Sequence, residues 1–394
     1  MNQKIFKFRG QVQYYEWGGY EYIPDLLGFD NAQHKPCAEY WMGAHPAASG
    51  SLETSSGWKS FLALIKENPV EYLGEKVVEK FGGLPYLLKV LDVRKMLSIQ
   101  VHPCKEEAEK GFAAEDAAGI PIGAKHRNYK DSNHKPEVMI ALGDFWLLHG
   151  FKNEVALSDI LRSTKEFDGL EQIFNEDGYY GLYKHVMEMP QAESDAMLSP
   201  LIQREAATTH SKDEPGFWVN KLYDNELPKS NIDRGIFSIY FFNLVHLLQG
   251  EGIFQAAGVP HAYLEGQNVE LMANSDNVLR GGLTSKHVDV PELLKHIVFE
   301  GIEPHILSPQ LDMAEENVYK MPVVDFGISS INFGSGREYV NESISPEIFL
   351  IMEGEISCDK INCKRGEVLV ILPRTEYTIR AVKSAMLYKA YVPA

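Results

Sequence analysis

The sequence has little cysteine and no long apolar run. Its 394 residues include four cysteines, and only Cys358 and Cys363 lie close together, without the partners that a zinc motif needs. We therefore expect reduced, structural thiols. The beginning of the chain lacks the apolar segment of a signal peptide, and no later run is long enough to cross a bilayer. These features predict a cytoplasmic protein that does not bind a membrane.

The sequence also has fewer positively than negatively charged residues. The chain has 38 lysines and arginines against 55 aspartates and glutamates, which gives a formal net charge of -17. This balance argues against nucleic acid or an anionic membrane as a partner, because neither would meet a broad basic face. A small anionic substrate needs only a few local cations, so it stays compatible with the composition.

The length suggests two or three domains, and the local pattern changes along the chain. Strand-like text with short helices fills 1–151, including a helical stretch that Pro69 should divide and a helix closed by Gly119. Helical periodicity dominates 152–233. Strand-like text returns from 234 and again from 319. We predict a mainly β protein in which 1–151 and 234–318 form one jelly-roll barrel, 152–233 form a helical insertion, and 319–394 form a second barrel.

An internal repeat supports the two barrels. The segment "GEGIFQAAGVPHAY" (250–263) is similar to "GEVLVILPRTEY" (366–377) when two residues are gapped. Aligning Tyr263 with Tyr377 places Thr375 opposite His261. We therefore expect the second barrel to lack a metal site.

Three segments with a strand-like sequence contain polar side chains. Ser98, Gln100 and His102 alternate after an apolar run, so an extended chain would put them on one face. Glu137 opens the next apolar run, and His261 follows a proline turn in "GVPHAYLEG". Imidazole, carboxylate and amide groups together suit a divalent metal ion with one open position. The spacing alone leaves open that each histidine is a hydrogen-bonded structural residue.

Six ordered blocks resemble the type I phosphomannose isomerases, a zinc-dependent family with cupin-type barrels. The blocks are "YYEWGG" (14–19), "AEYWMGAHPAASG" (38–50), "LPYLLKVLDVRKMLSIQVHP" (84–103), "YKDSNHKPE" (129–137), "GVPHAYLEG" (258–266) and "NSDNVLRGGLTSKHVDVPELL" (274–294). The resemblance implies two cupin-type barrels and reversible conversion of D-mannose 6-phosphate into D-fructose 6-phosphate through a cis-enediol. It also implies one zinc ion per chain, with Gln100, His102, Glu137 and His261 as its ligands.

The isomerase reaction needs a base near carbon, an acid near oxygen and a group that stabilises the enediolate. Arg280 is expected to stabilise negative charge, because a guanidinium does not readily act as a base. Lys135 and Asp276 are the first candidates for proton transfer, followed by His134. Two alternatives stay open: Lys135 binds only phosphate, and Asp276 only holds a loop or Arg280.

Lys89, Ser98 and Lys286 are candidates for phosphate binding, and Tyr263 is a candidate for the pocket wall. Lys89 lies in an apolar segment, where burial of an unpaired ammonium is costly. An odd number of residues separates it from Ser98, so a straight strand would put the two side chains on opposite faces. A bend is required if both of them reach the phosphate.

Three rival functions stay open at this point. One is a related sugar-phosphate isomerase with a different substrate preference. Another is a cupin-like sugar sensor that binds metal and ligand without turnover, although the presence of Arg280, Lys135 and all four ligands argues against it. The third is an iron-dependent cupin oxygenase, which Gln100 fits poorly because such sites rely on more histidines. Members of the resembled family are often monomeric, which predicts a monomer.

Overall fold

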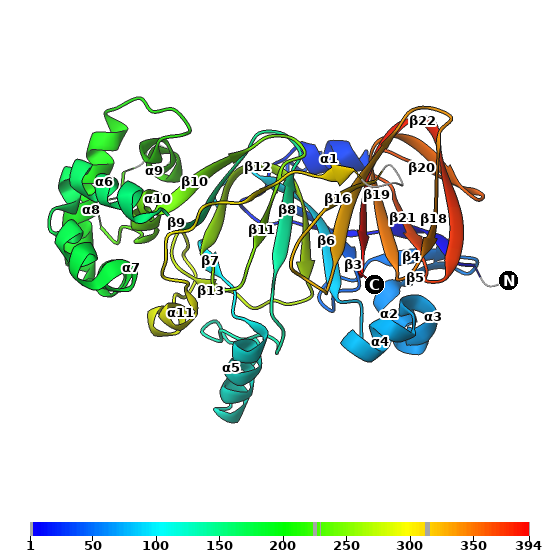
Figure 1. Ribbon diagram of the computed structural model, residues 1–394, viewed down its shortest axis with the longest axis horizontal. Coiled ribbons are helices and arrows are strands. Elements are labelled where there is room, and N and C mark those ends of the chain that lie inside the picture. Colours follow the sequence, from blue (N-terminus) through cyan, green and yellow to red (C-terminus); the bar gives the residue numbers. More distant parts are fainter. Residues whose placement is uncertain (1–2, 224–226, 229, 312–315, 394) are drawn as a thin grey trace.

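The computed structural model of the protein describes residues 3–223, 227, 228, 230–311 and 316–393. Two large β-sheets lie next to each other, and a group of helices covers one end of the molecule (Figure 1). Within the described residues, no helix combines the length and the apolar character needed to cross a membrane. All four cysteines are free thiols, as the sequence predicts, and only Cys104 is exposed.

The first sheet surrounds the candidate site. Its strands are β2 (Gln11–Gln13), β3 (Glu39–Gly43), β6 (Tyr86–Val93), β7 (Gln100–Val101), β8 (Glu137–Ala141), β9 (Phe145–Phe151), β10 (Phe242–Leu247), β11 (Gly252–Gln255), β12 (His261–Ala273), β13 (Leu279–Arg280) and β14 (Ile306–Leu307). The main path runs β14–β11–β8–β12–β6–β3–β2, and two pairs, β9 with β10 and β7 with β13, branch from β12. Both the expected first part and the expected second part of the barrel therefore contribute to this sheet.

Strand β12 organises the first sheet because it changes partners along its length. Its beginning pairs with β7 and β9, and its end pairs with β6 and β8. The register places His261 opposite Gln100 and Glu270 opposite Lys89. Residues directly opposite each other in a ladder have their side chains on one face, so β12 gathers polar groups from distant parts of the sequence.

The second sheet combines the two ends of the chain. Its strands are β1 (Ile5–Arg9), β4 (Ser51–Thr54), β5 (Gly57–Ser60), β15 (Gln310–Leu311), β16 (Glu316–Tyr319), β17 (Gly327–Phe333), β18 (Glu338–Ser343), β19 (Glu347–Cys358), β20 (Ile361–Lys364), β21 (Val368–Ile371) and β22 (Thr375–Tyr391). β1 pairs with β21 on one side and β4 on the other. The sheet thus extends beyond the expected boundary at 319. Long-range pairing of this kind leaves no local sequence signal.

The repeat in the sequence corresponds to similar strand positions in the two sheets. β12 begins at His261 and β22 begins at Thr375, which are the two residues that the alignment equates. Each is a long strand that pairs with several neighbours. The two aligned segments thus lead into long strands in different sheets.

The main hydrophobic core lies where the two sheets pack together. Leu88 and Val90 of β6 join a cluster that also contains Leu350 of β19 and Val370 of β21. The other face of β6 carries Lys89 toward the candidate site. All eight residues of β6 are buried, which explains its nearly continuous apolar sequence.

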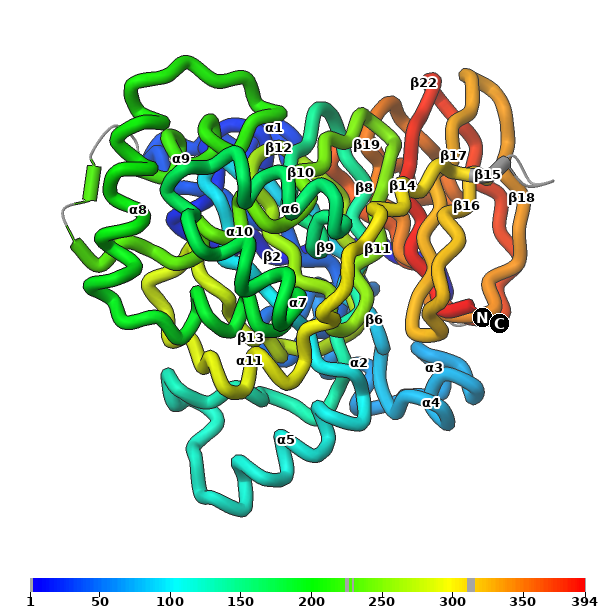
Figure 2. The backbone as a smooth tube through the Cα atoms, turned by 60° about the vertical axis from the view of Figure 1, so that its left-hand side comes forward, coloured from blue at the N-terminus to red at the C-terminus, as the bar shows by residue number. Residues whose placement is uncertain are grey.

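The helices flank the sheets in three groups. Near the N-terminus lie α1 (Tyr22–Leu27), α2 (Phe61–Glu67), α3 (Pro69–Leu73) and α4 (Glu75–Phe81), and α5 (Lys105–Ala117) projects from the body of the molecule (Figure 2). The third group, at the end of the first sheet, comprises α6 (Glu154–Ser163), η1 (Lys165–Phe167), α7 (Leu170–Glu188), α8 (Gln191–Ala206), α9 (Pro215–Tyr223), α10 (Gly235–Phe241) and α11 (Val290–His296). Pro69 divides the first helical stretch as predicted, because it begins α3.

One prediction of secondary structure was wrong. The stretch from 235 to 241 was expected to be strand-like, but it forms helix α10, and strand β10 begins only at Phe242. All seven residues of α10 are buried. A helix that is apolar on every side has no 3.6-residue pattern, so its sequence "GIFSIYF" cannot be distinguished from that of a buried strand.

Candidate active site

A cavity of about 790 Å³ lies against β3, β6 and β12 and the loop after β13. Every residue that the sequence analysis named as a metal, catalytic, phosphate or pocket-wall candidate lines this cavity, except His102 and His134. The lining residues in that set are Lys89, Ser98, Gln100, Lys135, Glu137, His261, Tyr263, Asp276, Arg280 and Lys286. The fold therefore collects side chains from segments almost two hundred residues apart in one place.

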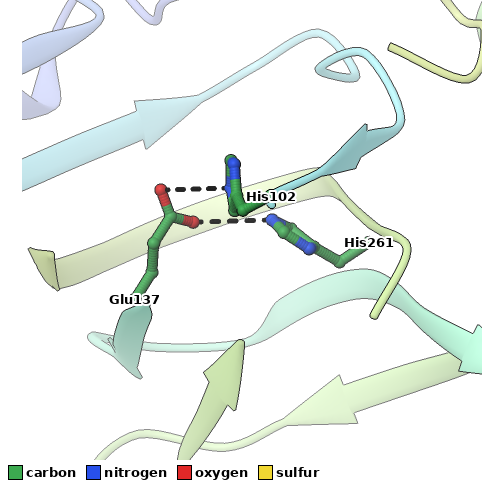
Figure 3. A group of neighbouring side chains, drawn as sticks. All are labelled: His102, Glu137 and His261. Carbon is green, nitrogen blue, oxygen red and sulfur yellow. Dashed lines mark ion pairs between the residues drawn. The ribbon is translucent and has the colours of Figure 1, made fainter. Parts of the chain in front are cut away.

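Three buried side chains, His102, Glu137 and His261, meet at one point, and the last two of them line the cavity (Figure 3). His102 Nε2 lies 3.5 Å from Glu137 Oε1, and His261 Nε2 lies 3.4 Å from Glu137 Oε2. One potential ligand atom from each residue lies within 4.8 Å of the other two. Two imidazole nitrogens and a carboxylate at this separation are a suitable donor set for a divalent cation.

Backbone contacts fix the orientation of both imidazoles. His102 Nδ1 lies 2.8 Å from the carbonyl oxygen of Asn277, and His261 Nδ1 lies 3.0 Å from that of Val259. When each Nδ1–H donates to its carbonyl, each Nε2 carries no proton, and its lone pair is available on the side of Glu137. Burial lowers the pKa of His102 to about 4, so its ring is neutral at physiological pH. Both histidines are thus prepared to coordinate a metal.

The carboxylate of Glu137 is ionised. Lys135 Nζ lies 2.9 Å from Glu137 Oε1, and both side chains are buried. Burial by itself would raise the pKa of Glu137, but the charge of Lys135 and the contact with His102 outweigh it and hold this pKa well below its ordinary value. A buried anion between two imidazole nitrogens favours a cation at the centre of the three.

The residues fit a zinc ion. Within the described part of the chain, the fully buried Nε2 of His102 has no hydrogen-bond partner, and a coordinated metal would satisfy it. Gln100 lies opposite His261 in the strand register and lines the same cavity, so its amide oxygen is available as a fourth donor. Two nitrogens and two oxygens, with room for substrate, match a catalytic zinc site.

Cationic and hydroxyl groups also line the cavity. They include Arg280, Lys286 and Ser98. Burial lowers the pKa of Arg280, and burial together with the charge of Arg280 lowers the pKa of Lys286. Two cations that line one cavity are suited to bind a dianion.

The chain belongs to a known family by several independent comparisons. The family model for the catalytic domain of type I phosphomannose isomerase matches residues 5–154. A mannose-6-phosphate isomerase from Salmonella typhimurium is 38% identical over 358 residues, which cover 89% of each chain. Another from Escherichia coli is 34% identical over 400 residues, which cover 98% of this chain and 97% of the other. This chain belongs to the type I phosphomannose isomerase family.

Solved structures of this family have the same fold over their full length. A crystal structure of a phosphomannose isomerase variant from Salmonella typhimurium superposes with a TM-score of 0.90 at 33% identity, and each chain is covered completely. A zinc-bound crystal structure of mannose 6-phosphate isomerase gives a TM-score of 0.88 at 34% identity, again with complete coverage. The β-rich architecture with its helical segment is therefore that of the family.

One candidate residue, His134, lies outside the cavity. Its Nε2 lies 3.0 Å from Asp325 Oδ1 in the segment before β17. Lys89 and Ser98 both line the cavity in spite of their odd spacing. β6 ends at Val93 and the chain leaves the strand, which supplies the required bend.

A buried charged cluster at the cavity wall was not predicted from the sequence. Lys89 Nζ lies 2.9 Å from Glu270 Oε2 and 3.7 Å from Glu39 Oε2, and the hydroxyl of Tyr263 donates to Glu270 Oε1 at 2.9 Å. Burial, which lowers the pKa of Lys89, is outweighed by the two carboxylates, so this pKa is raised. A signal was present, since Glu270 is an acidic residue within an apolar strand and needs a buried partner.

Proposed function

We propose that this chain interconverts D-mannose 6-phosphate and D-fructose 6-phosphate with the help of one zinc ion. One observation carries the proposal: a single cavity is lined by Glu137 and His261 of the His–Glu–His group, by candidate proton-transfer residues, and by cations of suitable chemistry for phosphate. The curated relatives that cover nearly the whole chain are named mannose-6-phosphate isomerases. Family and site thus agree on the reaction.

In this proposal Gln100, His102, Glu137 and His261 hold the zinc ion. When bound, the ion supplies a positive charge that polarises the sugar oxygens and stabilises a developing oxyanion. Glu137 contributes the only formal negative charge among the four ligands, so the site stays cationic. The carbonyl oxygens of Asn277 and Val259 keep both imidazoles oriented.

Proton transfer is assigned to Lys135 and Asp276. The reaction moves a proton between C1 and C2 of the sugar through a cis-enediol, while a second proton moves between the two oxygens. Both residues line the cavity, Lys135 beside Glu137 and Asp276 on the loop after β12. Arg280 stabilises the negative charge of the enediolate. His134 is left out of this group because its side chain faces Asp325.

The phosphate of the substrate is assigned to Lys286 and Ser98. Lys286 is a cation close enough to Arg280 to be affected by its charge, and Ser98 offers a hydroxyl in the same cavity. Lys89 is a weaker candidate, because Glu270 and Glu39 already neutralise its charge. With the phosphate at Lys286, the sugar carbons extend toward the zinc ligands, and Tyr263 contributes to the wall.

Three further parts of the account are proposals. We assign both sheets to cupin-type jelly-roll barrels, divided at the predicted boundaries with two exceptions. The helical segment continues to Phe241, and β1, β4, β5, β15 and β16 join the second barrel. The long strands that change partners, β12 and β22, support this assignment. A cytoplasmic location agrees with four free thiols. A monomeric state is proposed because members of the family are often monomeric.

A cupin-like sensor that binds the sugar phosphate without turnover is the principal rival. The experiment that separates the two is NMR spectroscopy of 13C-labelled mannose 6-phosphate in D2O with the zinc-loaded protein. We expect conversion to fructose 6-phosphate with deuterium appearing at the transferred position. His261→Ala is expected to lose both the zinc ion and the conversion. Binding of the sugar phosphate by fully metallated protein without any conversion would favour the sensor.

A further inference from the structure

A histidine that none of the roles above uses lies against Asp276. His45 follows strand β3 and is buried, with 5% of its surface exposed. Its Nε2 lies 3.5 Å from Asp276 Oδ2. The Asp276 side chain is about half exposed, at 53%, and lines the substrate cavity. A buried imidazole therefore contacts a carboxylate that lines the substrate cavity.

The backbone selects the tautomer of His45. The N–H of Ala47 donates to His45 Nδ1 at 3.2 Å, so this nitrogen carries a lone pair and no proton. The proton of the ring is then on Nε2, which is the nitrogen that faces Asp276. A contact of 3.5 Å is long for a hydrogen bond, and such contacts in free enzymes often shorten when substrate binds.

The ring is also held from the side. Trp41 packs against His45 with ring centroids 5.0 Å apart and planes at 80°, and Trp41 Nε1–H donates to the carboxylate of Glu39. His45 therefore has a fixed plane and a fixed tautomer before substrate arrives. This preorganisation is typical of residues that orient a reacting group.

Asp276 is fixed through its main chain as well. Its backbone N–H donates to Asp131 Oδ2 at 2.8 Å, and Asp131 Oδ1 accepts from the hydroxyl of Ser275 at 2.9 Å. The contact with His45 is the largest influence on the carboxyl group and lowers its pKa, with further lowering by Lys135 and Lys89. Asp276 is thus kept ionised, with Oδ2 facing His45 and its half-exposed side chain lining the cavity.

We propose that His45 is a positioning residue that aims the carboxylate of Asp276 at the carbon-bound proton of the sugar. The inference rests on the proposed isomerase function and assigns the base within it. For mannose 6-phosphate, the C2–H bond breaks and its proton passes to the carboxylate of Asp276. The electron pair of that bond forms the C1–C2 double bond of the enediol, and the former carbonyl oxygen takes the negative charge. The hydroxyl proton on the C2 oxygen then moves to the oxygen on C1. The electron pair of the double bond takes the proton back from Asp276 at C1, and the C2–O double bond of fructose 6-phosphate forms.

The test compares the zinc-loaded, full-length protein with its His45→Leu and His45→Gln variants. Leucine removes the N–H donor, whereas the glutamine amide retains one at a similar position. We expect His45→Leu to lower kcat by about 10- to 100-fold with little change in KM, and His45→Gln to recover most of the loss. Zinc content and melting temperature are measured for each protein, so that loss of metal or fold is recognised.

The outcomes separate the inference from the function on which it rests. A wild-type protein that converts mannose 6-phosphate while His45→Leu keeps its full kcat would overturn the inference and leave the function intact. Equal losses in His45→Leu and His45→Gln would also overturn it. A wild-type protein without turnover would remove the function itself.

A second measurement covers the case in which His45→Leu does not fold. Long-range 1H–15N NMR of the wild-type protein reports which ring nitrogen of His45 carries the proton. We expect protonated Nε2 and unprotonated Nδ1, and we expect the Nε2 signal to shift in Asp276→Ala while the Nδ1 signal stays. A proton on Nδ1, or no response of Nε2 to Asp276→Ala, would contradict the inference.

Discussion

Lys89 and Glu270 form a buried ion pair at the cavity wall, and their geometry predicts an asymmetric cost of mutation. Lys89 is 6% exposed and Glu270 is 3% exposed, and their charged atoms lie 2.9 Å apart. Lys89 also lies 3.7 Å from Glu39 Oε2, so one ammonium serves two carboxylates. Removing the cation leaves two buried anions, whereas removing Glu270 leaves Lys89 with one partner.

The magnitudes follow from this arrangement. Lys89→Met should lower the free energy of unfolding by about 3–5 kcal/mol, the usual cost of leaving a buried charge without its partner. Glu270→Gln should cost about 1–3 kcal/mol, because Lys89 keeps Glu39 and the amide can still accept from Tyr263. The double variant should be more stable than the sum of the single losses predicts, by about 1 kcal/mol or more.

The assay is denaturant unfolding of the metal-free protein, followed by both tryptophan fluorescence and circular dichroism. Lys383→Met is the matched control, since it removes an exposed lysine from its pair with Glu355 and should change stability little. Two results would refute the reasoning: a loss below about 1 kcal/mol for Lys89→Met, or strict additivity in the double variant.

Two further predictions concern the phosphate and acid stability. Lys286→Ala should raise KM for the sugar phosphate by about 10- to 100-fold with kcat nearly unchanged, whereas Lys383→Ala should leave KM as it is; an unchanged KM for Lys286→Ala would exclude its phosphate role. Burial, together with the charge of His261, lowers the pKa of His149 to about 4. Because the unfolded chain binds this proton near pH 6.5 and the folded chain does not, the stability of the metal-free protein should fall from pH 6.5 toward pH 4, by at most about 3 kcal/mol from this histidine. Urea unfolding at pH 7 and pH 4.5 should show a smaller fall for His149→Gln than for the wild type, and equal falls would contradict the assignment.

Local patterns in the sequence predicted those features that depend on neighbouring residues. Pro69 divides a helical stretch because its ring ends the preceding helix, and this effect needs no tertiary contact. The strand from Glu137 and the strand from His261 were also recognisable from apolar text next to a turn. Helix α10 was missed because tertiary burial on every side erased its periodicity.

Features that depend on contacts between distant residues could not be predicted from local sequence patterns. The pairing of β1 with β21 joins segments more than 350 residues apart, and nothing in either segment specifies the other. The cluster of Lys89, Glu270 and Glu39 arises from strand register in the first sheet, so the sequence showed only that each charge needed a partner. The candidate metal ligands were proposed because of the family resemblance, and the structure brings three of them together as a buried cluster.

The central claim is that this chain is a zinc-dependent mannose-6-phosphate isomerase, and a coupled assay of mannose 6-phosphate turnover tests it most directly. The purified protein is assayed as prepared, after removal of metal by a chelator, and after zinc is added back. The account predicts activity that disappears with the metal and returns with about one zinc ion per chain. A folded, fully metallated protein that does not convert mannose 6-phosphate, or one that keeps its full activity after the metal has been removed, would contradict it.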